Sequence, residues 1–242
     1  MTFQHDAATA AAHRLALYWT PPPDSALARI GAAWLGRDAA GAAVDDRPVI
    51  AGFDAAQLEA LTEAPRHYAL HATLKPPFVL AEGTDAAELV ASIQAAAREL
   101  TPVTMPPLEL RLLDGFLALT PRMPCPALDH LAGQCVALFD RFRRPAPAAE
   151  MAKRRAAGLT PRQDAYLLRW GYPYVFADFR FHVTLSERLD PVEAGRLQPA
   201  LAALFAPAIG QPIDVSDITL FSQVGPDRPF QEQARFPLTG AA

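Results

Sequence analysis

The sequence predicts an α+β fold that is built from two similar halves. The pattern His-x-Thr-Leu occurs twice, as HATL from His71 to Leu74 and as HVTL from His182 to Leu185. Around each copy the hydrophobic pattern follows the same order: strand, helix, short capped helix, motif strand, helix and strand. Because 242 residues suffice for two fused lobes that each bury a core, we expect one bilobal domain over residues 1–242. Lobe one is expected at about 14–113 and lobe two at about 114–242.

In the first half, helix and strand signals alternate. The run RLALYW alternates apolar with other residues, which is typical of a half-buried strand, and Asp24 is placed to cap the helix after it. Asp54 and Gln57 form a capping-box pattern, and the helix that they open must end before Pro65. The elements expected here are a strand from 14, a helix at 25–35, a short helix from 54, the motif strand at 68–73, a helix at 85–100 and a strand at 108–113.

The second half begins at a hairpin turn, Asp114-Gly115, and repeats this order. Thr160 and Gln163 form a second capping box, with Pro161 at the first helical position. The elements expected here are a strand at 116–121, a helix at 127–142, a capped helix from 160, the motif strand at 179–185, a helix at 190–205 and strands near 213–222 and 230–236.

The second half is longer because of additional residues between 141 and 162. This segment carries six basic residues: Arg141, Arg143, Arg144, Lys153, Arg154 and Arg155. It is either a solvated helical surface or a mobile flap over an anionic ligand, and a run of charge more often forms a solvated surface.

Composition narrows the class of protein. A formal net charge of −4 and a pI of about 5.9 argue against a general nucleic-acid binder but are compatible with a small phosphorylated substrate. The amino-terminal residues have no leader pattern, and no apolar stretch reaches the roughly 18 residues of a membrane span. We therefore expect a cytoplasmic chain without a membrane partner. Cys125 and Cys135 cannot form a disulfide framework and lack zinc-site spacing, so we expect no metal and no cofactor. The oligomeric state stays open.

The two motifs predict one phosphate site. On a strand, residues two positions apart share a face, so His71 and Thr73 point one way, and so do His182 and Thr184. Two imidazoles can accept and donate protons near neutral pH, and two hydroxyls can donate to phosphate oxygens. Such an arrangement suits in-line displacement at phosphorus and needs no metal. The sequence does not indicate which histidine acts as the acid.

The alternation of side chains between the two faces of a strand, here called strand parity, adds four weaker candidates for substrate binding. Lys75 lies on the expected face of the first motif, while Arg180 and Ser186 flank the second. Lys75 and Arg180 could pair with phosphate oxygens or equally be surface cations with extended stems. Tyr18 leaves the core face of its strand, so it either lines the groove or is exposed to solvent.

Other reaction classes lack their motifs. No G-x-S-x-G elbow, P-loop or G-x-G-x-x-G sequence is present. His67 and His71 have the spacing of a zinc site on a helix, but on the expected strand they are about 13 Å apart, too far to share a metal.

Two longer strings around the motifs resemble a known family. PRHYALHATLKPPFVL at 65–80 and RWGYPYVFADFRFHVTLSERL at 169–189 are similar to the two-histidine phosphoesterase superfamily, which includes RNA 2',3'-cyclic phosphodiesterases and 2'-5' RNA ligases. They look most like a bacterial branch whose genes accompany phosphonate degradation. The resemblance implies two pseudo-symmetric βα lobes whose antiparallel sheets face a central cleft. It also implies that His71 and His182 are the acid-base pair and that Thr73 and Thr184 bind phosphate.

The leading hypothesis is therefore a metal-independent cyclic phosphodiesterase that acts on a small phosphorylated sugar or nucleotide. The resemblance implies a ribose cyclic phosphate such as 5-phosphoribosyl 1,2-cyclic phosphate. Two alternatives remain open, an enzyme that acts on RNA ends and a module that binds a phosphate ligand without chemistry.

Overall fold

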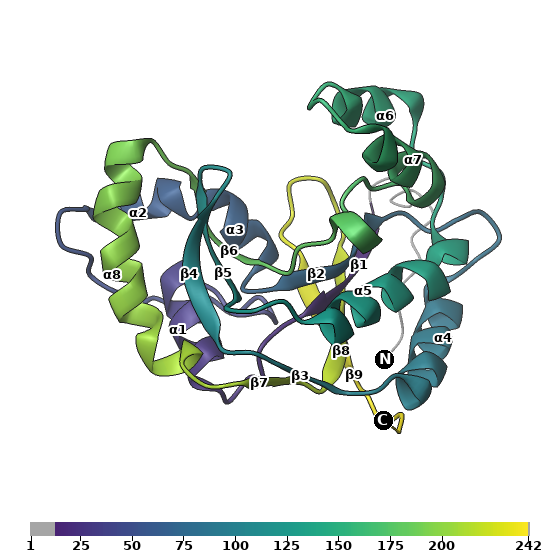
Figure 1. The fold of residues 1–242 in the computed structure, drawn as a ribbon, viewed down its shortest axis with the longest axis horizontal. Helices are drawn as coiled ribbons and strands as arrows, with labels where there is room; N and C mark the ends of the chain where they lie inside the picture. The colour runs from purple at the N-terminus through teal and green to yellow at the C-terminus, as the bar shows by residue number, and fades with distance from the viewer. Residues whose placement is uncertain (1–12, 242) are drawn as a thin grey trace.

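The structure is a computed structural model that describes residues 13–241. Residues 1–12, in which no leader was expected, and residue 242 lie outside the described residues. The predicted α+β class is confirmed, because helices surround two main antiparallel sheets (Figure 1). No helix in the described part of the chain is long and apolar enough to cross a membrane.

The strands form three sheets. The first sheet has the order β2-β1-β8-β9, the second has the order β4-β5-β6, and β3 pairs with β7. The strands are β1 (Arg14–Trp19), β2 (Ala72–Phe78), β3 (Val103–Met105), β4 (Leu108–Leu113), β5 (Phe116–Pro121), β6 (Val183–Arg188), β7 (Ile213–Val215), β8 (Asp217–Gln223) and β9 (Gln231–Pro237).

Eight α-helices and two 3-10 turns of the described chain cover these sheets. The helices are α1 (Ala26–Leu35), α2 (Ala55–Leu61), α3 (Glu63–Tyr68), α4 (Ala86–Glu99), α5 (Pro126–Leu138), α6 (Ala148–Arg155), α7 (Pro161–Trp170) and α8 (Pro191–Ile209), and the 3-10 turns are η1 (Asp140–Phe142) and η2 (Phe176–Asp178). Helix α8 contacts β4 and α1, whereas α5 contacts β2. Helices α6 and α7 project together beyond the four-stranded sheet (Figure 1).

The two sheets exchange strands between the sequence halves. Strand β4, from the first half, pairs with β5 and not with β1 or β2. Strands β8 and β9, from the end of the chain, complete the sheet of β1 and β2. The sheets therefore do not divide at residues 113 and 114, because the hairpin at Asp114-Gly115 keeps its two strands together.

Strand β1 is buried on both faces, and the prediction of a half-buried strand was wrong. Leu15, Leu17 and Trp19 join the main core. Tyr18, on the opposite face, is fully buried in a smaller cluster with Phe221. Strand β1 is paired with β2 along one edge and with β8 along the other, and buried side chains pack against both of its faces.

Both motif strands begin later than expected. Helix α3 occupies 63–68, and each motif histidine lies immediately before its strand. Pro65 fits within the first turn of α3, where a backbone N–H is not needed. Strand β2 continues through Pro76 and Pro77 because it lies at the edge of its sheet, where missing donors are tolerated.

The helix caps largely follow the sequence. Both capping boxes are present, with Asp54 accepting from the backbone N of Gln57 at 2.8 Å and Thr160 accepting from that of Gln163 at 3.2 Å. The cap of α1 is a correction: Ser25, not Asp24, accepts from the backbone of that helix.

Candidate active site

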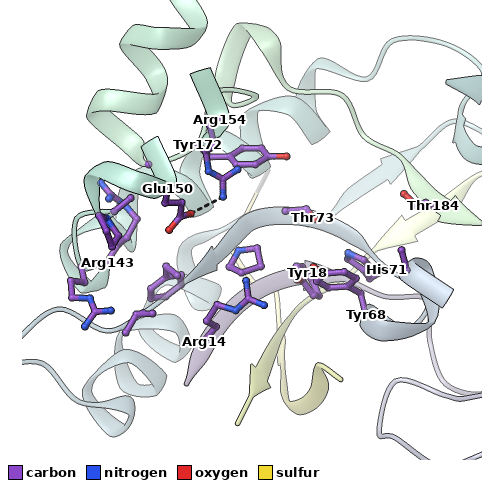
Figure 2. A pocket seen from close by; sticks show the side chains of 18 of the residues that line it. Arg14, Tyr18, Tyr68, His71, Thr73, Arg143, Glu150, Arg154, Tyr172 and Thr184 are labelled. Carbon is purple, nitrogen blue, oxygen red and sulfur yellow. Dashed lines mark hydrogen bonds and ion pairs between the residues drawn. The ribbon is translucent and has the colours of Figure 1, made fainter. Parts of the chain in front are cut away.

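The two His-x-Thr pairs line one pocket of about 570 Å³. His71 and Thr73 come from the entry to β2, and His182 and Thr184 come from the entry to β6. The sequence-based placement of these four side chains in a common cavity agrees with this arrangement. Figure 2 shows His71, Thr73 and Thr184 beside Tyr18 and Tyr68.

Contacts between the two sequence halves bring the motifs together. The ring of Phe181, just before the second motif, packs 5.5 Å from the ring of Trp19 on β1. Trp34 of α1 donates its indole N–H to the carbonyl of Leu185, with 2.7 Å between Nε1 and the oxygen. Both contacts are buried, so the second motif is fixed against elements of the first half.

The two histidines are oriented by the same local device. Nδ1 of His71 lies 3.0 Å from the carbonyl oxygen of Ala69, and Nδ1 of His182 lies 2.7 Å from that of Arg180. A carbonyl only accepts, so each Nδ1 carries the proton and donates it. Each Nε2 therefore accepts a proton when its ring is neutral and donates one when its ring is charged.

The carbonyl that orients His71 belongs to a strained residue. Ala69 ends α3 with φ 58 and ψ −176, a conformation that is essentially restricted to glycine. Holding alanine there costs about 1–3 kcal/mol. Ala69 is buried, so the surrounding packing sustains this conformation. The chain turns sharply between α3 and β2 at this point.

Burial keeps His71 neutral at neutral pH. Its ring centroid lies 4.1 Å from that of Tyr18 and 5.5 Å from that of Tyr68. Burial lowers the pKa of His71 to about 4, and the positive charge of a protonated His182 lowers it further, while the Ala69 carbonyl opposes both effects. The pKa of Tyr18 is raised well above its usual value by burial, so its hydroxyl stays protonated.

Lys75 does not line the pocket, which corrects the expectation from strand parity. Lys75 pairs with Leu17 and Thr73 pairs with Tyr18, so β2 has one extra residue, Leu74, between them. Directly opposed residues share a face, so this bulge turns Lys75 to the core side. Its ammonium is buried, donates to the Val136 carbonyl at 3.2 Å and lies 3.8 Å from an Asp140 oxygen. Burial lowers the pKa of Lys75 to about 8.

Ser186 and Arg180 are also absent from the pocket lining. The pairing of β5 with β6 is irregular between Phe116 and Ala118, and there the Ser186 hydroxyl accepts from the backbone N of Leu117 at 3.0 Å. Ser186 thus satisfies a buried donor of the sheet. Arg180 is exposed and contributes its carbonyl to His182 rather than its guanidinium to the pocket. Of the four weaker candidates, Tyr18 alone lines the cavity.

Further pocket residues were not among the site candidates from the sequence, although Arg143, Arg144 and Arg154 belong to the basic segment for which a flap over an anionic ligand was one alternative. The larger polar side chains among them are Arg14, Tyr68, Arg143, Arg144, Glu150, Arg154 and Tyr172. Strand parity gave a signal for Arg14, because it lies four positions before Tyr18 on the same strand. The others come from loops and helix ends whose direction has no periodic signal.

The basic segment is divided between the pocket and the surface. Arg143, Arg144 and Arg154 line the cavity. Arg141 instead lies 3.9 Å from Glu88, and Arg155 pairs with Asp164 at 2.6 Å. Helix α6, which carries Arg154, stands beside the cavity (Figure 2). The solvated-surface interpretation therefore holds for only part of the segment.

The pocket offers no cluster of metal ligands. Between residues 13 and 241, no three His, Cys, Asp or Glu side chains are grouped so that they could hold a metal ion. Cys135 is buried, and burial raises the pKa of its thiol to about 12.

A family comparison classifies the chain. Residues 73–231, which include both motif threonines and His182, match the family described as "Protein of unknown function (DUF1045)". The chain belongs to the DUF1045 family.

Two curated relatives of this DUF1045 chain are both described as "Ribose 1,5-bisphosphate phosphokinase PhnN". The one from Janthinobacterium sp. (strain Marseille) is 38% identical over 231 residues, which are 94% of this chain and 51% of the relative. The one from Laribacter hongkongensis (strain HLHK9) is 37% identical over 205 residues, which are 83% of this chain and 46% of the relative. The DUF1045 chain spans about half the length of the curated relatives it matches.

Solved structures similar to the DUF1045 chain are described as phosphoesterases or as LigT. A phosphoesterase covers 94% of this chain and 99% of its own, with 16% identity and a TM-score of 0.41. The match to E. coli LigT complexed with 3'-AMP covers 94% of this chain and 99% of the LigT chain, with 18% identity and a TM-score of 0.43.

Proposed function

We propose that the chain is a cyclic phosphodiesterase that uses His71 and His182 as its acid-base pair and requires no metal. One observation carries the proposal: both His-x-Thr pairs line one cavity, and both imidazoles are held through Nδ1, which leaves Nε2 for the substrate. A volume of about 570 Å³ suits a small-molecule ligand.

In the proposed reaction, water attacks phosphorus and a ring P–O bond breaks on the opposite side. His71, kept neutral by its low pKa, takes the proton of the attacking water. His182 in its charged form gives a proton to the departing sugar oxygen. The hydroxyls of Thr73 and Thr184 donate to the non-bridging oxygens, where negative charge develops in the transition state. The product is a phosphate monoester, and the two histidines have exchanged protonation states.

The curated relatives suggest the substrate. When the bond between phosphorus and the 2-oxygen of 5-phosphoribosyl 1,2-cyclic phosphate breaks, the 2-oxygen remains on the sugar as a hydroxyl and the product is ribose 1,5-bisphosphate, the compound in the name of both relatives. The present chain lacks a P-loop sequence and matches only about half of those proteins, so we do not assign it the kinase activity. We propose instead that it forms the substrate for such a kinase.

The pocket charges favour a small substrate over an RNA end. The net charge of the chain is −4, and the pocket arginines are gathered within the cavity rather than spread along an outer surface. An enzyme that contacts many RNA phosphates needs an extended positive surface. Turnover separates the proposed enzyme from a module that only binds phosphate.

Phosphorus NMR tests this proposal directly. The full chain in excess EDTA is incubated with 5-phosphoribosyl 1,2-cyclic phosphate and, in parallel, with a 2',3'-cyclic nucleotide. We expect ring opening of the ribose compound, with ribose 1,5-bisphosphate as product, and no opening by His71→Ala or His182→Ala. Ring opening of the nucleotide alone would instead indicate an enzyme that acts on RNA ends. Opening of neither compound would contradict the proposed chemistry.

A further inference from the structure

The pocket extends from the two motifs towards a cluster of arginines. Four guanidinium groups line it, from Arg14, Arg143, Arg144 and Arg154, against a single carboxylate, Glu150, in the described lining. In Figure 2, Arg14, Arg143 and Arg154 lie on the side of the cavity away from His71 and Thr184. This cationic end is therefore separate from the residues of the proposed chemistry.

One of these arginines, Arg143, is held by partners within the protein, although its carboxylate partner Asp140 also lies near Arg169 and Lys75. The side chain of Arg143 donates to both carboxylate oxygens of Asp140, at 2.8 and 3.4 Å. It also donates to the carbonyl of Arg169 at 3.1 Å. Arg143 is thus committed to the protein and helps to fix the loop before α6.

The other three keep unused positive charge or donors. Arg14 donates to the side-chain oxygen of Gln223 at 2.6 Å, a neutral partner. Arg154 pairs with Glu150 at 3.0 Å, but its Nε is buried without a hydrogen-bond partner. The guanidinium of Arg144 has no hydrogen bond or ion pair with any described residue.

An aromatic ring holds part of this end in place. The guanidinium carbon of Arg154 lies 5.1 Å from the ring centre of Tyr172, which also lines the pocket. Such a cation–π contact restrains the guanidinium and leaves its remaining N–H groups for an anion. A buried guanidinium donor without a partner is costly, and a bound anion offsets that cost.

We propose that this end of the pocket binds a second phosphate of the substrate, a terminal phosphate monoester away from the reacting cyclic phosphate. Arg144, Arg154 and Arg14 supply the donors, because guanidinium groups match phosphate oxygens in pairs. The identity of the substrate as a ribose cyclic phosphate rests on the proposed function. The subsite itself makes the pocket selective for sugars that carry a further phosphate.

Calorimetric binding to the full chain tests the subsite without turnover. The probes are ribose 5-phosphate and ribose, with wild type and the variants Arg144→Gln and Arg154→Gln. We expect wild type to bind ribose 5-phosphate at least about tenfold more tightly than ribose, because charged hydrogen bonds contribute on that scale. Each variant should bind ribose 5-phosphate about tenfold more weakly than wild type does, and its affinity for ribose should be unchanged.

Two control variants sharpen the result. Arg141→Gln removes the same charge from the same segment, but Arg141 lies outside the pocket against Glu88, so binding should be unchanged. Glu150→Gln removes the carboxylate that competes for Arg154 and should strengthen binding of ribose 5-phosphate. This opposite sign cannot arise from misfolding.

The outcomes separate the two proposals. If a variant lost the same affinity for ribose as for ribose 5-phosphate, the subsite would be overturned. It would also be overturned if Arg141→Gln and Arg144→Gln lost the same affinity for ribose 5-phosphate. Phosphate-dependent binding without ring opening would leave the subsite standing and contradict the proposed function. Ring opening without any preference for the 5-phosphorylated compound would do the reverse.

Discussion

Acid should destabilise the folded chain through His71. The pKa of this residue is about 4 in the folded state, against an ordinary value of 6.5. The unfolded chain therefore binds the proton first, so the contribution of His71 is complete above pH 6.5 and is lost as the pH falls towards 4. One pKa unit corresponds to about 1.4 kcal/mol, so the loss amounts to about 3 kcal/mol of the free energy of unfolding.

Urea unfolding of wild type and His71→Gln, followed by tryptophan fluorescence at pH 7, 6, 5 and 4, measures this loss. Glutamine has no titrating group, so the variant lacks this component while all other titrations are shared. We expect the free energy of unfolding of wild type to fall by about 3 kcal/mol more than that of the variant across this range. Parallel pH profiles, or an NMR titration of His71 with a midpoint near 6.5, would refute the reasoning.

Three further predictions concern the second motif and the two corrected residues. His182→Ala should lower kcat by about 10²–10⁴ because it removes the proton donor, with an unchanged melting temperature as the check of folding; near-normal turnover would exclude the role. Lys75→Met should leave KM for the cyclic phosphate unchanged because Lys75 faces the core, and a raised KM in steady-state kinetics would restore the original expectation. Ser186→Ala should reduce stability by about 1–3 kcal/mol, since it strands the buried N–H of Leu117, and should not change KM; calorimetric melting without a shift would contradict this reason.

Local signals in the sequence predicted most elements and the four motif side chains. Capping boxes and the Asp114-Gly115 turn depend on neighbouring residues only, so they were readable, and the turn is present with φ 47 and 92. His71 and His182 are each oriented through Nδ1 by the carbonyl two residues earlier, so the repeated tetrapeptide corresponds to a repeated local arrangement.

The features that the sequence did not predict depend on contacts between distant parts of the chain. Parity assumes an uninterrupted strand, and the bulge at Leu74 moved Lys75 to the other face. The exchange of β4 and β8 between sheets depends on pairing across the whole chain, for which no local pattern exists. Arg144 and Arg154 were visible as charge, but the placement of α6 and of the loop before it, which brings them to the cavity, has no local signal.

Because β1 pairs with β8, the pocket can form only late in the synthesis of the chain. Arg14 lies opposite Gln223 in the ladder and is held by its side chain, a contact that spans 209 positions of the chain. During translation β1 has no inner neighbour until β8 has emerged from the ribosome, and contacts of this range form slowly. A nascent chain that ends before β8 can therefore contain both histidines and still lack the partner that holds Arg14 at the pocket. Formation of this end of the pocket therefore requires the chain at least through β8.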